Sequence, residues 1–364
     1  MSAARSARTK PAAKPTTLDV VCFGEALWDL FERPGSRDGA GEPIAREFRR
    51  ELGGAPANVA TGLARLGVAA AVAGGIGLDT FGDALEKHLR DDHVATRFLI
   101  RLPNRTGITF VARDALGEPK FLPYRQETAD VAVRAEHVTS DMGRARWVLV
   151  GTSTMMTPSL AAATDRFLTV AEGAKAHVVV DLNVREHLWA SKAQMRDAVA
   201  QLVRRASIVK GSFADLVAIT GRRDILWLAD HAPRAAWIVT QGPKGASALG
   251  DHGFVARPGR KAKCVDATGA GDAFIAGVLA VLLEAGATPG SPAWKDERVW
   301  SAALDAGHAM GAKAVSRVGA VTGLEDLGEV SALVKSVKRL PARPVPPEPR
   351  ERRGARVGAK RRAR

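Results

Sequence analysis

Continuous apolar segments recur through the middle of this 364-residue chain, and amphipathic helical segments separate them. Strands without polar alternation are typical of a parallel sheet that helices cover on both faces. The strands are expected at 19–27, 69–77, 146–152, 177–183, 206–212 and 236–242, and the helices at 56–67, 79–92, 158–174, 191–205 and 213–220. The sequence therefore predicts an α/β fold with a mostly parallel central sheet.

Residues 96–125 follow a different pattern. TRFLIRL, GITFVARD and KFLPYR are short alternating strands, joined by turns at 103–104 and 116–117. Such alternation is typical of a half-exposed antiparallel sheet. We expect a small β-sheet lid, built from about 29–52 and 96–125, that closes over the ends of the parallel strands and excludes water.

The net charge of +14 is concentrated at the two ends of the chain. Residues 1–17 carry +4 and residues 341–364 carry +7, which leaves +3 for residues 18–340. The C-terminal end is rich in Pro and Arg and has no apolar periodicity, so it cannot form a core alone. Both ends are expected to be disordered basic tails, and a weak contact with nucleic acid is their alternative role.

Composition limits the compartments in which the chain is expected. No apolar run reaches the roughly 18 residues of a membrane helix, and the N-terminus lacks the apolar centre of a secretion signal. The acid-free N-terminus would also suit a transit peptide, although it has no apolar face. Cys22 and Cys264 form no disulfide framework or metal-binding spacing, which suits a reducing compartment. A cytoplasmic protein is therefore expected.

The stretch DATGAGDAF (266–274) follows strand-like residues 261–265 and precedes an apolar helix. The small residues at the expected helix N-terminus are Thr268, Gly269, Ala270 and Gly271. Free N–H groups and the helix dipole bind anions at such a place. Asp272 would lie beside the anion in the first helical turn. If the anion is a phosphoryl group, Asp272 can take the proton of the attacking hydroxyl.

Together with GGAPANVATGLARLG (53–67), this stretch resembles the two signatures of the PfkB (ribokinase-like) family of carbohydrate kinases. The resemblance extends over most of residues 18–328. It implies a ribokinase-like three-layer sandwich with a small lid, a kinase domain over 18–340, and the use of ATP and Mg²⁺. It also makes Asp272 the catalytic base and residues 269–271 the anion hole for the transferred phosphate.

The resemblance assigns sugar contacts to two N-terminal segments. Asp29 matches an aspartate that binds sugar hydroxyls, with a turn aspartate as the alternative. Gly53 and Gly54 match the backbone that lies against the sugar. Asn58 matches an asparagine that binds hydroxyls, with a hydrogen bond inside its own helix as the alternative.

Nucleotide contacts are implied in the C-terminal half. TQGPKG (240–245) matches the family's nucleotide-side turn, and His308 falls near the expected adenine, with an ordinary helix-face histidine as the alternative. The positions expected to contact ATP are Thr240, Gly242, Gly245, Thr268, Gly269, Gly271 and His308.

Two cation sites are implied by the resemblance. AVSRVGAVTG (314–323) and the DATG loop hold a monovalent cation in many members, so K⁺ is a possible cofactor, bound mainly by carbonyl groups. The matching positions are Asp266, Thr268, Ala314, Arg317, Gly319 and Gly323. Asp215 stands where many members use a glutamate to organise Mg²⁺ through water, and its side chain is one methylene shorter.

The stretches CFGEALWDLF and DLNVREHLW resemble the fructokinase and 2-keto-3-deoxygluconate kinase branch. In that branch Arg125 and Arg185 would reach the substrate side. Two guanidinium groups could grip a substrate carboxylate, donate to fructose hydroxyls, or pair with acids of the scaffold. Fructose is ranked first and 2-keto-3-deoxygluconate second.

Other classes of protein fit less well. A kinase-like regulatory scaffold, with tails that bind nucleic acid, would be expected to lose the base or the glycines, and both are present. A dinucleotide dehydrogenase is disfavoured because the glycines of GGIGLDTFG have the wrong spacing. A homodimer through the lid is the expected assembly if the chain is not a monomer.

Overall fold

The computed structural model describes residues 17–33, 35, 45–113 and 119–340. The expectations for the two tails, for lid residues 36–44 and for the 116–117 turn lie outside these residues. The strands are β1 Leu18–Phe23, β2 Leu27–Glu32, β3 Phe48–Gly53, β4 Ala70–Gly77, β5 Ala95–Leu102, β6 Ile108–Arg113, β7 Pro119–Tyr124, β8 Ala145–Gly151, β9 His177–Asp181, β10 Ile208–Ser212, β11 Ala236–Thr240, β12 Ala246–Gly250 and β13 Gly253–Arg257. The α-helices are α1 Ala55–Arg65, α2 Thr80–Asp91, α3 Pro158–Gly173, α4 Lys192–Val203, α5 Phe213–Thr220, α6 Leu226–His231, α7 Ala270–Glu284, α8 Glu297–Ala314 and α9 Gly328–Ser336.

The central sheet has nine strands in the order β13-β12-β11-β10-β9-β8-β1-β4-β5. Its strands pair in parallel from β5 to β11, and only β12 and β13 add an antiparallel edge. The predicted core strands appear in it as β1, β4, β8, β9, β10 and β11. The prediction of a mostly parallel α/β sheet is therefore confirmed.

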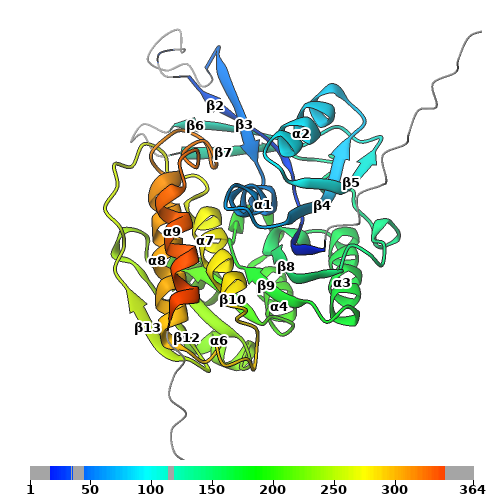
Figure 1. Cartoon of the computed structure of the whole chain (residues 1–364). Helices are drawn as coiled ribbons and strands as arrows, with labels where there is room; N and C mark the ends of the chain where they lie inside the picture. The colour runs from blue at the N-terminus through cyan, green and yellow to red at the C-terminus, as the bar shows by residue number, and fades with distance from the viewer. Residues whose placement is uncertain (1–16, 34, 36–44, 114–118, 341–364) are drawn as a thin grey trace, which may run out of the picture.

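Helices cover both faces of this sheet and make three layers (Figure 1). Side chains of β1 alternate between the two faces, with Val20 and Cys22 in one apolar core and Val21 and Phe23 in the other. The first core contains α1, α7, α8 and α9, and the second contains α3, α4 and α5. In the described part of the chain, no helix combines the length and apolarity needed to cross a membrane.

The lid is a separate four-stranded sheet in the order β3-β2-β6-β7, seen beside α1 in Figure 1. Within 96–125, β6 and β7 pair antiparallel, whereas β6 pairs in parallel with β2. Residues 96–102 were wrongly assigned to the lid. They form most of β5, which pairs in parallel with β4 at the edge of the central sheet. An edge strand is half-exposed, so its sequence alternates as a lid strand does.

Two further strand predictions were wrong. The apolar run 19–27 breaks at Gly24, where φ is +143° and a side chain would collide with Pro56. The chain then leaves the central sheet and enters the lid as β2. Residues 261–265 form no strand, because the central sheet already ends at β13. Val265 donates its N–H to the carbonyl of Val315, over 2.7 Å.

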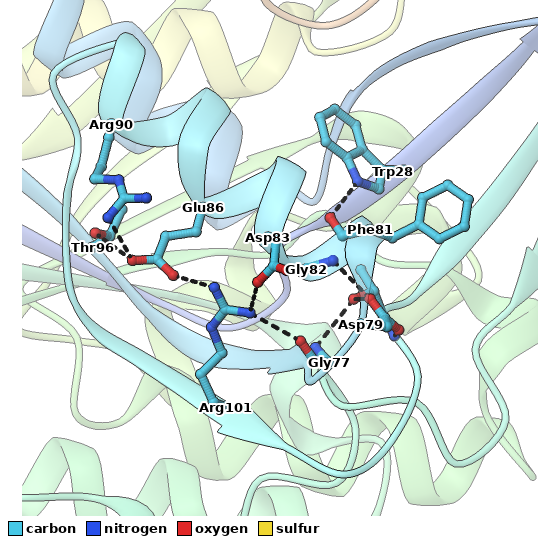
Figure 2. A network of polar contacts seen from close by, with 11 residues as sticks. Trp28, Gly77, Asp79, Phe81, Gly82, Asp83, Glu86, Arg90, Thr96 and Arg101 are labelled. Carbon is cyan, nitrogen blue, oxygen red and sulfur yellow. Dashed lines mark hydrogen bonds and ion pairs between the residues drawn. The ribbon is translucent and has the colours of Figure 1, made fainter.

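A polar network fixes the start of α2 and ties it to the lid (Figure 2). Asp79 is the N-cap of the helix, and its Oδ1 accepts from the N–H of Gly82 over 2.7 Å. The same carboxylate accepts two hydrogen bonds from Thr106, which precedes β6. The indole of Trp28 in β2 donates to the carbonyl of Phe81 over 3.0 Å. Asp29, the next residue of β2, is thereby held at the pocket described below.

Candidate active site

A pocket of about 310 Å³ lies between the lid and the carboxyl ends of the parallel strands. Ligands of open α/β sheets bind at this edge. The expected functional residues that line it are Asp29, Gly54, Asn58, Arg125, Arg185, Thr268, Gly269, Ala270, Gly271 and Asp272. The structure thus brings together residues that are more than 240 positions apart in the sequence.

Asp272 lies in the first turn of α7 and is 7% exposed. Its Oδ2 accepts a hydrogen bond from Nδ2 of Asn58 over 2.8 Å. Burial raises the pKa of Asp272, while this hydrogen bond and the charges of Lys210 and Arg185 lower it. Asn58 therefore does not only serve its own helix. Its Oδ1 is buried and has no hydrogen-bond partner among the described residues.

The GAGD loop has the conformation that an anion hole needs. Helix α7 begins at Ala270, as predicted, and Gly269 is its N-cap with φ +74°. A Cβ at Gly269 would lie 2.4 Å from Cβ of Ala320, so only glycine fits. Residues of the first turn line the pocket, and the first N–H groups of a helix have no partner within the helix itself. This supports the expected place for an anion beside Asp272.

The lid contributes Asp29, which is 6% exposed. Its carboxylate packs against Gly53, where a Cβ would lie 2.5 Å from Cγ of Asp29. Gly53 thus makes room for Asp29, while Gly54, with φ +95°, lines the pocket itself. Burial raises the pKa of Asp29 to about 8, although the charge of Arg125 acts in the opposite direction.

The two arginines expected to bind the substrate differ in whether their guanidinium group is already paired with a carboxylate. Arg125 lines the pocket, but its Nε and Nη2 both donate to Oδ2 of Asp130, over 2.7 and 2.6 Å. Arg185 follows β9 at the rim and is exposed. Within the described residues its side chain makes one long hydrogen bond, 3.4 Å, to the carbonyl of Val184. Of the two guanidinium groups, Arg185 is the one available to a ligand.

Four of the expected nucleotide contacts lie outside the residues that line this pocket, namely Thr240, Gly242, Gly245 and His308, whereas Thr268, Gly269 and Gly271 line it. Thr240 ends β11 beside Ser212 of β10, at the same edge of the sheet. Gly242 has φ +57° and open space around it. Gly245 has a structural role, because a Cβ there would lie 2.2 Å from the carbonyl oxygen of Arg257. His308 in α8 packs edge-on against Phe274, with ring centroids 5.2 Å apart, and burial lowers its pKa.

The residues of the implied monovalent-cation site partly converge. Asp266 accepts hydrogen bonds from the N–H and hydroxyl of Thr268, and from the N–H of Gly319 over 2.9 Å. Gly323 lies against the carbonyls of Lys313 and Ala314, close enough to exclude a side chain. Arg317 turns its side chain away and pairs with Glu325.

Asp215 lies in the first turn of helix α5 and forms a capping box with Ser212, the N-cap. Its Oδ1 accepts from the N–H of Val184 over 2.7 Å, and its Oδ2 accepts from the N–H and hydroxyl of Ser212. Both carboxylate oxygens of Asp215 thus accept hydrogen bonds from the protein. No group of three or more His, Cys, Asp or Glu side chains able to hold a metal ion occurs within the described residues.

Three charged residues of the site were missed from the sequence. Glu25 lines the pocket and accepts a hydrogen bond from the hydroxyl of Ser153 over 2.8 Å. Asp181 also lines it and pairs with buried Lys210. Glu25 follows β1 and Asp181 ends β9, whereas Lys210 lies in the middle of β10. For the two acids, a charge at the carboxyl end of a parallel strand was thus the signal that was available.

The fold and the pocket define a small-molecule phosphotransferase site, with an anion-binding helix terminus beside a buried carboxylate. The family model "pfkB family carbohydrate kinase" matches residues 17–327. The chain therefore belongs to this family, and it is a sugar kinase.

Curated relatives include fructokinase-1 of Zea mays, 32% identical over 324 residues, which cover 87% of this chain and 97% of the relative. A fructokinase of Vibrio alginolyticus is 31% identical, over 75% of this chain and 88% of that protein. Together these matches bear out the predicted resemblance to the fructokinase branch.

Solved structures agree with the fold. Fructokinase of Xylella fastidiosa with bound ATP has a TM-score of 0.74 and 28% identity, over 88% of this chain and 99% of that one. A fructokinase variant of Vibrio cholerae with bound fructose, ADP and potassium ion also has a TM-score of 0.74, with 26% identity over 87% of this chain and 99% of that one. These ligands belong to the relatives, and the three-layer fold is shared.

Proposed function

We propose that this sugar kinase transfers the γ-phosphoryl group of ATP to a primary hydroxyl of fructose. The observation that carries the proposal is the position of Asp272. Its buried carboxylate lies in the first turn of α7, beside the glycine-rich helix terminus and in the same pocket as Asp29 and Asn58. A base, an anion hole and sugar-binding groups thus share one cavity.

The proposed mechanism uses the residues that line this cavity. Closure of the lid excludes water, and Asp29 and the free Oδ1 of Asn58 accept hydrogen bonds from sugar hydroxyls. Asp272, held by Nδ2 of Asn58, accepts the proton of the reacting hydroxyl as its oxygen attacks the phosphorus in line. The N–H groups at Gly269, Ala270 and Gly271 stabilise the charge on the transferred phosphoryl group.

Bound Mg²⁺ would neutralise the phosphate charge of ATP. Proteins usually hold this ion through one or two carboxylates, water and substrate phosphates. Asp215 is the proposed protein contribution, through water. The proposed nucleotide contacts are Thr240, Gly242, Gly245, Thr268 and His308, and Asp266, Thr268 and Gly319 are proposed to order the loop around K⁺.

Two observations favour fructose over 2-keto-3-deoxygluconate. Arg125 is already neutralised by Asp130, so a substrate carboxylate would find only Arg185. The pocket is also lined by Glu25, Asp181 and Asp272, beside Asp29, whose pKa is raised by burial. Like charges within one low-dielectric cavity repel. An uncharged ketose therefore suits this pocket better than a sugar acid.

ADP release, measured with fructose, 2-keto-3-deoxygluconate, ribose and a nucleoside, tests the proposal. We expect kcat/KM to be highest for fructose by at least about tenfold, the size of a few altered polar contacts. A higher value for the sugar acid would overturn the choice of fructose. Absence of ADP release with every sugar would overturn the catalytic proposal and favour the regulatory scaffold.

The remaining proposals concern the setting of the enzyme. We infer a cytoplasmic enzyme from its two free cysteines, of which Cys264 is exposed. A homodimer through the lid is proposed on the exposed side chains of β7, where Tyr124 is 65% and Leu122 37% exposed. A weak contact of the basic tails with nucleic acid would weaken steeply with salt.

A further inference from the structure

A buried lysine lies beside the candidate base without belonging to any assigned role. Lys210, in β10, is 4% exposed. Its Nζ lies 3.0 Å from each carboxylate oxygen of Asp181. The register of the two neighbouring parallel strands creates the pair, because Lys210 is aligned directly with Asp181 of β9.

The ammonium group also contacts the GAGD loop. A Cβ at Gly271 would lie only 2.8 Å from Nζ of Lys210. Because Gly271 has no side chain, the ammonium group of Lys210 can lie against it, one residue before Asp272. The sequence explained this glycine by the approach of a phosphate, and the structure adds a second reason.

Stability alone does not explain this arrangement. A positive charge at a helix N-terminus is unfavourable, because the dipole there is also positive. Burial of an ammonium group costs further free energy, and a buried ion pair seldom repays it fully. What the location gains is proximity to the Asp272 carboxylate.

The surroundings of Asp272 show why a cation is useful there. Several charged or titratable groups interact electrostatically with Asp272, namely Glu25, Asp29, Arg185, Asp181, Lys210 and Cys22. Three of these are carboxylates, and Arg185 is exposed at the rim. Lys210 is thus the one buried cation of this set.

We propose that Lys210, held in place by Asp181, is a positioning residue that keeps the Asp272 carboxylate ionised as the proton acceptor. The inference rests on the proposed role of Asp272. The directions of the pKa shifts of Lys210 and Asp272 agree with this role. Burial would lower the pKa of Lys210, but Asp181, Asp215 and Asp272 raise it, so the ammonium stays charged. In turn, Lys210 lowers the pKa of Asp272 against the effect of burial.

The test is the pH dependence of kcat/KM for the sugar that the wild-type enzyme uses best. In Lys210→Met, the acidic limb of the plot of kcat/KM against pH is expected to move to higher pH by about one unit. This is the shift that a lost opposite charge produces. Activity should then recover at alkaline pH. Lys87→Met is the matched control, because Lys87 pairs with Asp91 on the surface of α2, and its limb should stay at the wild-type pH.

Asp181→Asn supplies an opposite readout, and it also serves if Lys210→Met does not fold. It leaves the ammonium without its neutralising partner, so the limb should move to lower pH. A purely structural pair would lower kcat by one factor at all pH values and leave both limbs unmoved, which would overturn the inference. An inactive wild-type enzyme would instead overturn the proposed function, so the two failures are distinguishable.

Discussion

The amide of Asn58 and the carboxylate of Asp272 join the two signature segments of the chain through one hydrogen bond of 2.8 Å. The two residues are 214 positions apart in sequence. Helix α1 supplies the donor and helix α7 the acceptor, and the two helices pack together in the same apolar core. The bond fixes the direction of the proposed base and leaves Oδ1 of Asn58 for a ligand.

Asn58→Ala should therefore lower kcat/KM for the sugar by about 10- to 100-fold, the usual size of one hydrogen bond to a charged group. Steady-state kinetics measures this. Thr61→Val is the control, because Thr61 is buried one turn further along α1 and its hydroxyl has no partner among the described residues. Equal losses in both variants would show that α1 packing, rather than the amide, matters.

Gly269→Ala should abolish most turnover and also destabilise the protein. The left-handed φ costs about 1–2 kcal/mol for a residue with a side chain, and the contact with Ala320 adds to this cost. Gly67→Ala is the control, because Gly67 has φ +82° but open space around it. Urea denaturation should show a smaller loss for Gly67→Ala, with turnover retained. A similar loss of turnover in both variants would contradict the anion-hole assignment.

Asp79→Ala should lower the free energy of unfolding by about 1–2 kcal/mol, since the N-cap and the bonds to Thr106 are lost together. Asp83→Ala removes only an exposed ion pair with Arg101 and should cost less than about 0.5 kcal/mol. Thermal unfolding monitored by circular dichroism compares the two. Equal shifts of Tm would show that the network in Figure 2 does not depend on the cap.

Much of the fold followed from local pattern, and the errors have a common cause. Buried strands and helices could be predicted because the pattern of apolar and polar side chains in each segment reflects its own burial. The assignment of 96–102 failed because an edge strand of the central sheet and a lid strand expose one face alike. Only the pairing partner separates them, and that partner is set by the tertiary fold.

The site was predictable where a motif marks it and not elsewhere. Asp272, Asn58 and Asp29 stood in recognisable stretches and line one pocket. The pairing of Lys210 with Asp181 depends on the register of two strands, which neither strand encodes alone. Likewise, Arg125 looked like a ligand for a carboxylate, and its pairing with Asp130 appears only once the lid is built.

The stability of the protein should depend on pH through Asp29. Burial raises its pKa from 3.8 to about 8, so the folded state holds a proton that the unfolded state releases above pH 4. The contribution of Asp29 to stability is therefore full below pH 4 and is lost as the pH rises toward 8. Asp29→Asn should remove this dependence and make the variant more stable than wild type at pH 8, by about 1–3 kcal/mol. Urea denaturation at pH 5 and pH 8 measures it, and an unchanged pH dependence would contradict a buried, protonated Asp29.

The most direct test of the whole account is the turnover of Asp272→Asn with the preferred sugar. The amide keeps the shape of the side chain and can still bond with Asn58, but it cannot accept the proton. We predict a fall in kcat of about 10²- to 10⁴-fold, the usual contribution of a general base, with the melting temperature nearly unchanged. Asp165→Asn on the surface of α3 should keep full activity. Turnover of Asp272→Asn within a few-fold of wild type would contradict the assignment of Asp272 as the base.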